Sequence, residues 1–390
     1  MKKIYIYFLL LSSVIGFSQI PTNYYSTATG TGYALKTQLK KIINTANDGL
    51  SPEYFHVDRG YGAGSSQTNN GLWSAYGTTD RDNGIGYEND NSIVDIYSER
   101  PSSADPYNYT FSTSQCGSYN SEADCYNREH LIPQSYFGGN TPPSQFASMR
   151  NDVHHVYPTD GYVNSRRSDF AFGKVNVASY TSQNGSKLGS ALNSGYSAGF
   201  TGTVFEPIDE FKGDIARVFL YFATRYEDEM DDLYTTYTGV DTRVMFDGST
   251  DKVFNATFLN ILLTWHEQDP VSTKEIIRND ASYVHQSNRN PYIDHPEYVA
   301  SIWGTSLATN DFSENVFNIY PNPSNGNFRI DYDPTIGDIT IEVYSVLGQK
   351  VFEKQNSNDN TVSVNGLQTG VYLVKINKDS KSVIKKVVIN

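Results

Sequence analysis

Three adjacent residues with reactive side chains, Arg128, Glu129 and His130, stand about a third of the way along the chain. If they lie on a strand, successive side chains alternate between its two faces. Glu129 would then face a bound cation and His130 an attacking water on the opposite side, unless the strand ends or bulges there. The plainer alternative is a strand end with a salt-bridged glutamate, since short motifs often match by chance. Taken alone, the three residues favour that alternative.

A second polar group follows in the sequence. Residues 152–158 alternate in character and predict another strand, which the proline at its end would terminate. Thr159 or Asp160 can cap a helix that begins directly afterwards. Asn164 would lie about one turn into this helix, with Arg167 as its neighbour on the helix surface, because residues three apart are adjacent there. The predicted order is strand, loop, strand and helix.

Periodicity and composition predict the elements around these groups. Apolar spacing indicates helices at residues 35–43, 208–230 and 253–265, and a capping box at residues 272–275 opens another. Residues 91–98 are rich in β-branched side chains and predict a strand, whereas residues 289–296 contain two prolines and predict a loop. From residue 317 onward, short β-type runs alternate with Asn-, Gly-, Pro- and Ser-rich stretches, which is typical of a small antiparallel sandwich.

The first residues have the features of a secretory signal peptide. Lys2 and Lys3 supply the charged start, residues 4–17 the apolar run and Ser18 a small residue at the cleavage site. The apolar run is too short to span a bilayer as a helix, which takes about 20 residues, and no later run is long enough. We therefore expect an exported protein without a transmembrane segment.

The only two cysteines are Cys116 and Cys125. In an oxidising compartment they are expected to form a disulfide that fixes the entry to residues 128–130. Two cysteines without clustered partners make a poor zinc site.

The net charge of −13 argues at first sight against a polyanionic partner. The acidity is unevenly distributed, however. Residues 206–251 carry twelve acidic and four basic side chains, whereas residues 126–175 carry five basic and four acidic ones. The total charge therefore does not exclude nucleic acid as a ligand.

Two smaller groups of residues are expected to be structural. His154 and His155 cannot easily share an ion, because adjacent strand residues face opposite ways, and we expect His154 in the core or in support of a site residue. The acidic run at residues 227–232 lacks the ligand spacing of a calcium-binding loop, which favours a solvated acidic face.

Several blocks of sequence, taken in order, resemble known families. Residues 127–135, 152–158 and 161–168, with further blocks at 94–98, 213–217 and 289–296, are similar to the secreted bacterial endonuclease I family of ββα-metal nucleases. The tail from about residue 315 resembles the type A C-terminal sorting domain of the type IX secretion system, through residues 319–326, 346–349 and 370–372. Ordered blocks are far more specific than one short motif.

The nuclease resemblance implies roles for individual residues. Glu129 and Asn164 would be the protein ligands of one Mg²⁺ ion, with Ca²⁺ or Mn²⁺ as substitutes, and His130 would be the general base. The residues suit this chemistry, because a neutral imidazole can take a proton from water and a hard cation prefers oxygen ligands. Arg167 would be a catalytic arginine that clamps a phosphate, the alternative being a surface salt bridge to Asp160 or Asp169. Further candidates for phosphate or nucleic-acid contacts are Arg128, Arg150 and Arg166.

The resemblances also imply an organisation for the whole chain. They divide it into a signal peptide (1–18), an N-terminal extension without a recognised counterpart (19–80), a nuclease domain (81–306), a linker (307–316) and a secretion sorting domain (317–390). The expected fold class is α+β: a mainly helical nuclease domain with a ββα-metal finger, followed by a small all-β sandwich.

The implied function is that of a secreted, metal-dependent endonuclease. It would hydrolyse phosphodiester bonds of DNA, with RNA as a further substrate, without sequence specificity, and leave 5′-phosphate ends. We expect a monomer that the type IX secretion machinery delivers to the medium or the cell surface. The alternative is an adhesin or glycan-binding protein with the same tail, which the aromatic content of 14% would suit because aromatic rings stack on sugars.

Overall fold

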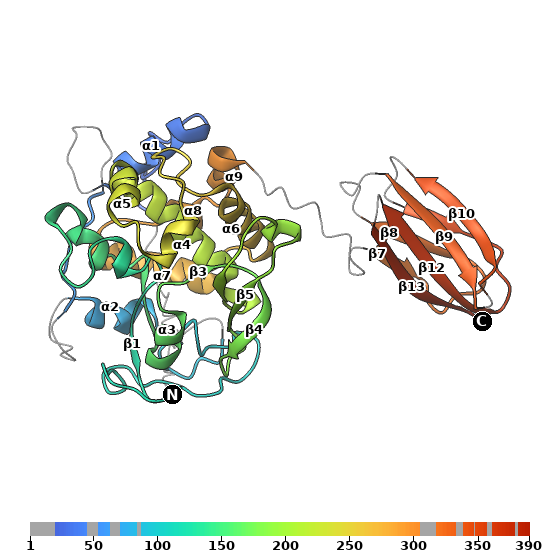
Figure 1. The fold of residues 1–390 in the computed structure, drawn as a ribbon, viewed down its shortest axis with the longest axis horizontal. Coiled ribbons are helices and arrows are strands. Elements are labelled where there is room, and N and C mark those ends of the chain that lie inside the picture. Colours follow the sequence, from blue (N-terminus) through green and yellow to red (C-terminus); the bar gives the residue numbers. More distant parts are fainter. Residues whose placement is uncertain are drawn as a thin grey trace, which may run out of the picture. The chain divides into compact units, whose positions relative to one another are not determined.

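The computed structural model describes residues 20–44, 54–62, 71–83, 87–304, 317–332, 338–346, 348–356, 361–378 and 381–390. The chain forms two compact units, Met1–Thr305 and Ser306–Asn390 (Figure 1). The predicted signal peptide and linker lie outside the described residues.

The first unit mixes helices and strands. Its helices are α1 (Gly32–Ile43), α2 (Leu72–Thr79), α3 (Gly161–Arg167), α4 (Lys212–Arg225), α5 (Met230–Thr236), α6 (Ala256–Gln268), α7 (Thr273–Gln286), α8 (Pro291–Asp294) and α9 (Glu297–Trp303). Its strands are β1 (Tyr126–His130), β2 (Val156–Asp160), β3 (Ala171–Phe172), β4 (Val175–Thr181), β5 (Lys187–Ala191) and β6 (Thr203–Glu206). β1 and β2 form an antiparallel pair, and the other four strands form a sheet in the order β3-β6-β5-β4.

Helix α4 lies in the middle of the first unit (Figure 1), and every one of its residues is buried. Its apolar stripe includes Ile215, Phe219 and Phe222, all in the main hydrophobic core. A helix buried on all sides must also satisfy its charges, and Arg217 does so through Glu275 of α7, with its Nε 2.6 Å from Oε1. The predicted helix at 208–230 is therefore confirmed in its centre, although the α-helix ends at Arg225.

Other local predictions had mixed outcomes. Helices α1 and α6 confirm those predicted at 35–43 and 253–265, and both hydrogen bonds of the capping box open α7. The strand predicted at 91–98 is wrong. Ile93 makes an isolated bridge, and the chain then turns because the Asp95 carboxylate accepts the Tyr97 backbone N–H at 2.8 Å. The segment 289–296, predicted to be a loop, contains α8, which the Asn290 side chain caps.

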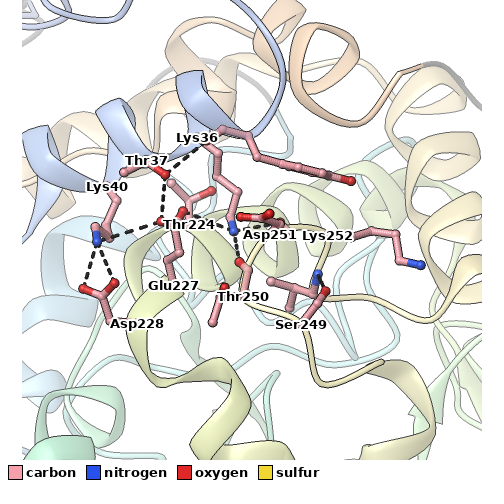
Figure 2. Close-up of polar contacts among 12 residues, drawn as sticks. Lys36, Thr37, Lys40, Thr224, Glu227, Asp228, Ser249, Thr250, Asp251 and Lys252 are labelled. Carbon is pink, nitrogen blue, oxygen red and sulfur yellow. Dashed lines mark hydrogen bonds and ion pairs between the residues drawn. The ribbon is translucent and has the colours of Figure 1, made fainter.

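Helix α1 packs into the same core, which ties it to the rest of the first unit. Figure 2 shows its polar contacts with Glu227 and Asp228. Its Lys36 Nζ lies 3.2 Å from Glu227 Oε2, and the Thr37 hydroxyl donates to Glu227 Oε1 at 2.8 Å. Lys40 Nζ contacts the Asp228 carboxylate at 2.8 Å. The expectation of a solvated acidic face is therefore wrong for Glu227, which is buried, because the lysines of α1 neutralise it.

The second unit is all-β. Its strands are β7 (Phe317–Tyr320), β8 (Phe328–Tyr332), β9 (Ile339–Ser345), β10 (Lys350–Asn356), β11 (Thr361–Val364), β12 (Gly370–Lys378) and β13 (Lys381–Ile389). They form two antiparallel sheets, in the orders β10-β9-β12-β13 and β11-β8-β7, whose buried side chains share one hydrophobic cluster. In the described part of the chain, none of the helices combines the length and the apolar character that crossing a bilayer requires.

Candidate active site

The entry to β1 is fixed covalently and by the backbone. Cys116 and Cys125 form the predicted disulfide, with their Cα atoms 5.7 Å apart. Around it, the Tyr126 N–H donates to the Ser114 carbonyl at 2.9 Å, and the Cys116 N–H donates to the Tyr126 carbonyl at 3.1 Å. The disulfide loop therefore holds the first residue of β1 in place.

The second strand begins later than its sequence predicts. It runs from Val156 through Pro158 to Asp160, while the preceding residues form a turn. Pro158 is tolerated inside the strand because the β1–β2 pair has only two strands, so the missing N–H can face away from the partner. Asp160 caps α3 as predicted, and its carboxylate accepts the Val163 N–H at 2.9 Å.

Glu129, His130 and Asn164 line one pocket of about 390 Å³. β1 ends at His130, and the two side chains have different partners: Glu129 contacts Tyr97 and Arg167, whereas His130 contacts the Arg150 carbonyl and Gln134. The other lining residues are Arg128, Pro133, Gln134, Ser135, Arg167, Ser168 and Asp169. The end of β1 thus brings both residues to the wall of one pocket.

Glu129 is almost fully buried, and two neighbours hold its carboxylate. The Tyr97 hydroxyl donates to Oε1 at 2.7 Å, and Arg167 Nη1 lies 3.2 Å from the same oxygen. Burial raises the pKa of Glu129 to about 7, although the positive charge of Arg167 and the Tyr97 hydrogen bond oppose this shift. A nearby cation would favour the ionised carboxylate.

His130 is held in one tautomer by its two hydrogen bonds. Its Nε2 lies 3.0 Å from the Arg150 carbonyl oxygen, which can only accept, so Nε2 carries the hydrogen. Nδ1 is then the acceptor, and it receives a hydrogen bond from the Gln134 amide at 3.1 Å. Burial, followed by the proximity of His155, holds the pKa of His130 well below its usual value. His130 is therefore neutral at pH 7, with its basic nitrogen bound by a pocket residue.

Asn164 presents an oxygen to the pocket. Its Nδ2 donates to Asn127 Oδ1 at 2.8 Å and to the Arg128 carbonyl at 3.3 Å. These bonds tie the amide nitrogen to β1, which leaves Oδ1 as the atom for a ligand. Glu129 and Asn164 together offer two oxygen donors of the kind that hard divalent cations bind.

Arg167 lies in the interior instead of on the helix surface, and it is fully buried. Its guanidinium donates to the His130 carbonyl at 3.1 Å and to the Leu131 carbonyl at 2.5 Å, besides its contact with Glu129. Neither predicted salt-bridge partner, Asp160 nor Asp169, is its ion-pair partner in the described part of the chain. Arg167 therefore joins α3 to the end of β1 and neutralises Glu129.

The remaining arginines lie in different surroundings. Arg128 lines the pocket, and its guanidinium stacks on the Tyr61 ring at 3.4 Å. Arg150 stacks on the same ring at 3.6 Å, so the two guanidinium groups share one tyrosine. Arg166 is exposed and lies over Tyr162 at 4.7 Å. The structure thus brings Arg128 to the pocket, and it brings Arg150 to the same aromatic ring.

The paired histidines after the predicted metal motif belong to the core. The Nε2–H of buried His154 donates to the Asn288 carbonyl at 3.0 Å. Asp152 lies beside it and accepts hydrogen bonds from Tyr221 at 2.8 Å and from Tyr226 at 3.0 Å. This network anchors the turn before β2 and agrees with the structural role expected for His154.

Sequence reasoning missed three residues that shape the site. Gln134 was inside the recognised block but gave no sign of its contact with His130. Tyr97 lies in a segment predicted to be a strand, and Tyr61 lies in a segment without a recognised motif. Tyr97 and Tyr61 reach the site through contacts between distant parts of the chain, for which a local pattern has no signal. Gln134 is only four residues from His130, but their contact depends on the turn that follows β1.

The pocket is suited to hydrolysis, because it combines oxygen ligands for a cation with a neutral histidine. Comparison with known proteins agrees with this class. The Endonuclease I family model matches residues 31–297, and the chain belongs to that family. The match begins inside the segment 19–80 that was expected to be an extension. A second model, the Secretion system C-terminal sorting domain, matches residues 318–390.

Two curated relatives are extracellular enzymes. The chain is 32% identical over 296 residues to an extracellular ribonuclease of Bacillus amyloliquefaciens, covering 75% of this chain and 82% of the relative. It is 30% identical over 284 residues to an extracellular ribonuclease of Bacillus subtilis (strain 168), covering 72% and 78%. The protein is therefore a nuclease located outside the cell or at its surface. These matches decide against the adhesin alternative.

Proposed function

We propose that the protein is a one-metal endonuclease that hydrolyses phosphodiester bonds in DNA and RNA without sequence specificity. The observation that carries this proposal is the convergence of Glu129, Asn164 and His130 on one pocket, with the basic nitrogen of His130 identified by its hydrogen bonds. Enzymes of this family generally depend on a divalent metal ion.

The donor set fits such an ion. Glu129 supplies a carboxylate, and Asn164 supplies an amide oxygen whose partner nitrogen is already bound to β1. Two protein ligands leave several positions to water and phosphate oxygens, which suits Mg²⁺, with Ca²⁺ or Mn²⁺ as substitutes. When bound, the ion would supply positive charge beside the scissile phosphate and the departing 3′-oxygen.

His130 would act as the general base. It takes a proton from water at Nδ1, which requires that the water replace the Gln134 amide as the partner of that nitrogen. The water oxygen then attacks phosphorus and the bond to the 3′-oxygen breaks, so that the phosphate stays on the 5′ end of the downstream product. The Arg150 carbonyl fixes the ring throughout by accepting from Nε2.

The arginines of the site would have different roles. Arg128 lines the pocket and is the candidate for a phosphate contact there, with Arg150 and Arg166 as candidates farther along the nucleic acid. Arg167 is better suited to positioning, because its guanidinium is committed to Glu129 and to backbone carbonyls. Contacts of this kind to the sugar–phosphate backbone carry no direct sequence information.

The names of the curated relatives support RNA as a substrate, and the name of the family supports internal cleavage. The C-terminal unit would serve as the sorting signal that the type IX secretion machinery recognises. The nuclease unit and the sorting unit thus have separate tasks.

The test uses the purified mature protein with supercoiled plasmid and with structured RNA, in Mg²⁺ and in excess EDTA. Both substrates should be cleaved only with the metal. His130→Ala should lower the rate by about 10²–10⁴-fold while keeping metal affinity, because only the base is lost. Glu129→Ala should lose metal affinity as well. His295→Ala, at a partly exposed histidine remote in sequence, is the matched control and should keep full activity.

Undiminished cleavage by His130→Ala, with the circular dichroism spectrum unchanged and contaminating nucleases excluded, would overturn the assignment of the base. Cleavage that persists in EDTA would overturn the role of the metal. A 3′-phosphate on the products, detected by end-labelling, would overturn the proposed bond cleavage.

A further inference from the structure

A second group of carboxylates lies outside the pocket of Glu129. One oxygen from each of Glu88, Glu99 and Asp105 lies within 4.8 Å of the other two. Glu88 is exposed and Asp105 is half-buried, whereas the Glu99 residue is only 1% exposed. Burial, followed by the charges of Asp105 and Glu88, raises the pKa of Glu99 to about 9, so this carboxyl ionises at neutral pH only if a positive charge joins the group.

The buried member of this group has no donor. In the described part of the chain, neither carboxylate oxygen of Glu99 accepts a hydrogen bond. Nearby buried acids are satisfied: Asp82 lies 2.9 Å from Lys274 Nζ, and Asp95 accepts from the Tyr97 N–H at 2.8 Å. The adjacent cation, Arg100, directs its guanidinium to the Gln183 carbonyl instead. Buried carboxylates are almost always hydrogen-bonded, paired or bound to a metal, so Glu99 calls for a ligand.

The chemistry of the three side chains selects the kind of cation. All the donors are carboxylate oxygens, which excludes a preference for soft metals and favours a hard cation. A spacing of up to 4.8 Å is about twice a Ca²⁺–oxygen distance of 2.3–2.6 Å, so one ion can reach all three groups. The donors come from irregular segments, and Ca²⁺ tolerates irregular geometry, whereas Mg²⁺ demands a near-octahedral site. The exposure of Glu88 leaves one side open to water ligands.

We propose that Glu88, Glu99 and Asp105 bind one Ca²⁺ ion at a structural site separate from the active site. The ion joins the segment around Glu88 to the turn between Glu99 and Asp105. Glu99 follows Tyr97 by two residues, and the Tyr97 hydroxyl holds the Glu129 carboxylate. The calcium site therefore steadies the backbone from which Tyr97 reaches the active site.

The experiment counts bound Ca²⁺ by isothermal titration of the full mature chain. Wild type, Glu129→Gln, Glu88→Gln and the double variant are compared, with Glu297→Gln as the control at another exposed glutamate. Glu88→Gln should remove one equivalent of bound Ca²⁺ or weaken its binding at least tenfold. This effect should be the same with and without Glu129→Gln. Because Glu88 is exposed, this variant should fold, whereas Glu99→Gln changes the interior.

Thermal unfolding supplies a second readout. In the Glu129→Gln background, millimolar Ca²⁺ should raise the Tm by roughly 3 °C, and Glu88→Gln should abolish that rise. If Glu129→Gln binds no Ca²⁺, the proposal is wrong. The group is then stabilised by a proton that Glu99 and Glu88 share. Unchanged binding in Glu88→Gln also overturns it, because the ion then lies elsewhere.

Discussion

The position of Arg167 leads to a prediction that separates a positioning role from a phosphate clamp. The guanidinium is fully buried, contacts Glu129 at 3.2 Å and donates to the carbonyls of His130 and Leu131. Arg167→Leu would leave a buried carboxylate and two carbonyls without their partner. Loss of one member of a buried ion pair costs about 3–5 kcal/mol, and we expect the free energy of unfolding to fall by about that amount.

The neighbouring Arg166 offers a matched control, because it lies on the same helix but is exposed. Arg166→Leu should change the free energy of unfolding by less than about 0.5 kcal/mol. Urea unfolding in EDTA, followed by tryptophan fluorescence, is the measurement. All three tryptophans, Trp73, Trp265 and Trp303, lie in the first unit, so the signal reports that unit alone.

Activity measured on the same variants completes the test. If Arg167 is a positioning residue, Arg167→Leu should lower the stability and the cleavage rate together. Arg167→Lys should keep part of both because it retains the charge. If Arg167→Leu unfolds at the same urea concentration as Arg166→Leu but cleaves poorly, the guanidinium serves the phosphate and the reasoning from its buried contacts is refuted.

Two further predictions concern Tyr97 and the buried histidines. Tyr97→Phe removes the 2.7 Å hydrogen bond to Glu129, so the free energy of unfolding should fall by about 1 kcal/mol. The affinity for Mn²⁺, measured by titration calorimetry, should fall by about tenfold. An unchanged affinity would contradict the positioning role of Tyr97. Burial lowers the pKa of His154 and of His56 to about 4, against about 6.5 when unfolded. At these two histidines the unfolded state therefore binds protons that the folded state does not, so the stability that they contribute should decrease as the pH is lowered from about 6.5 to about 4. His154→Gln should flatten the resulting slope of the urea midpoint against pH, and an equally steep slope in this variant would rule out His154 as a source.

Local sequence patterns predicted the elements whose stability is local. The apolar spacing of residues 35–43 and the capping box of α7 involve neighbours along the chain, and both appear as expected. The strand predicted at 91–98 failed for the same kind of reason, because the Asp95 side chain binds the backbone two residues on and turns the chain. The four strands of the β3-β6-β5-β4 sheet were not predicted. β4 pairs with the next strand, β5, but it is exposed along most of its length and so lacks an apolar pattern, and β3 pairs with the distant β6.

The sequence by itself determined the class of enzyme and indicated three residues that line the pocket. The types of Glu129, His130 and Asn164, together with the order of the blocks around them, were sufficient for that. Only the tertiary structure decided how these residues are held: the Arg150 carbonyl selects the tautomer of His130, and Tyr97 and Arg167 hold Glu129. Such contacts depend on burial and on the path of the chain between distant segments, and neither is encoded in any short stretch of residues.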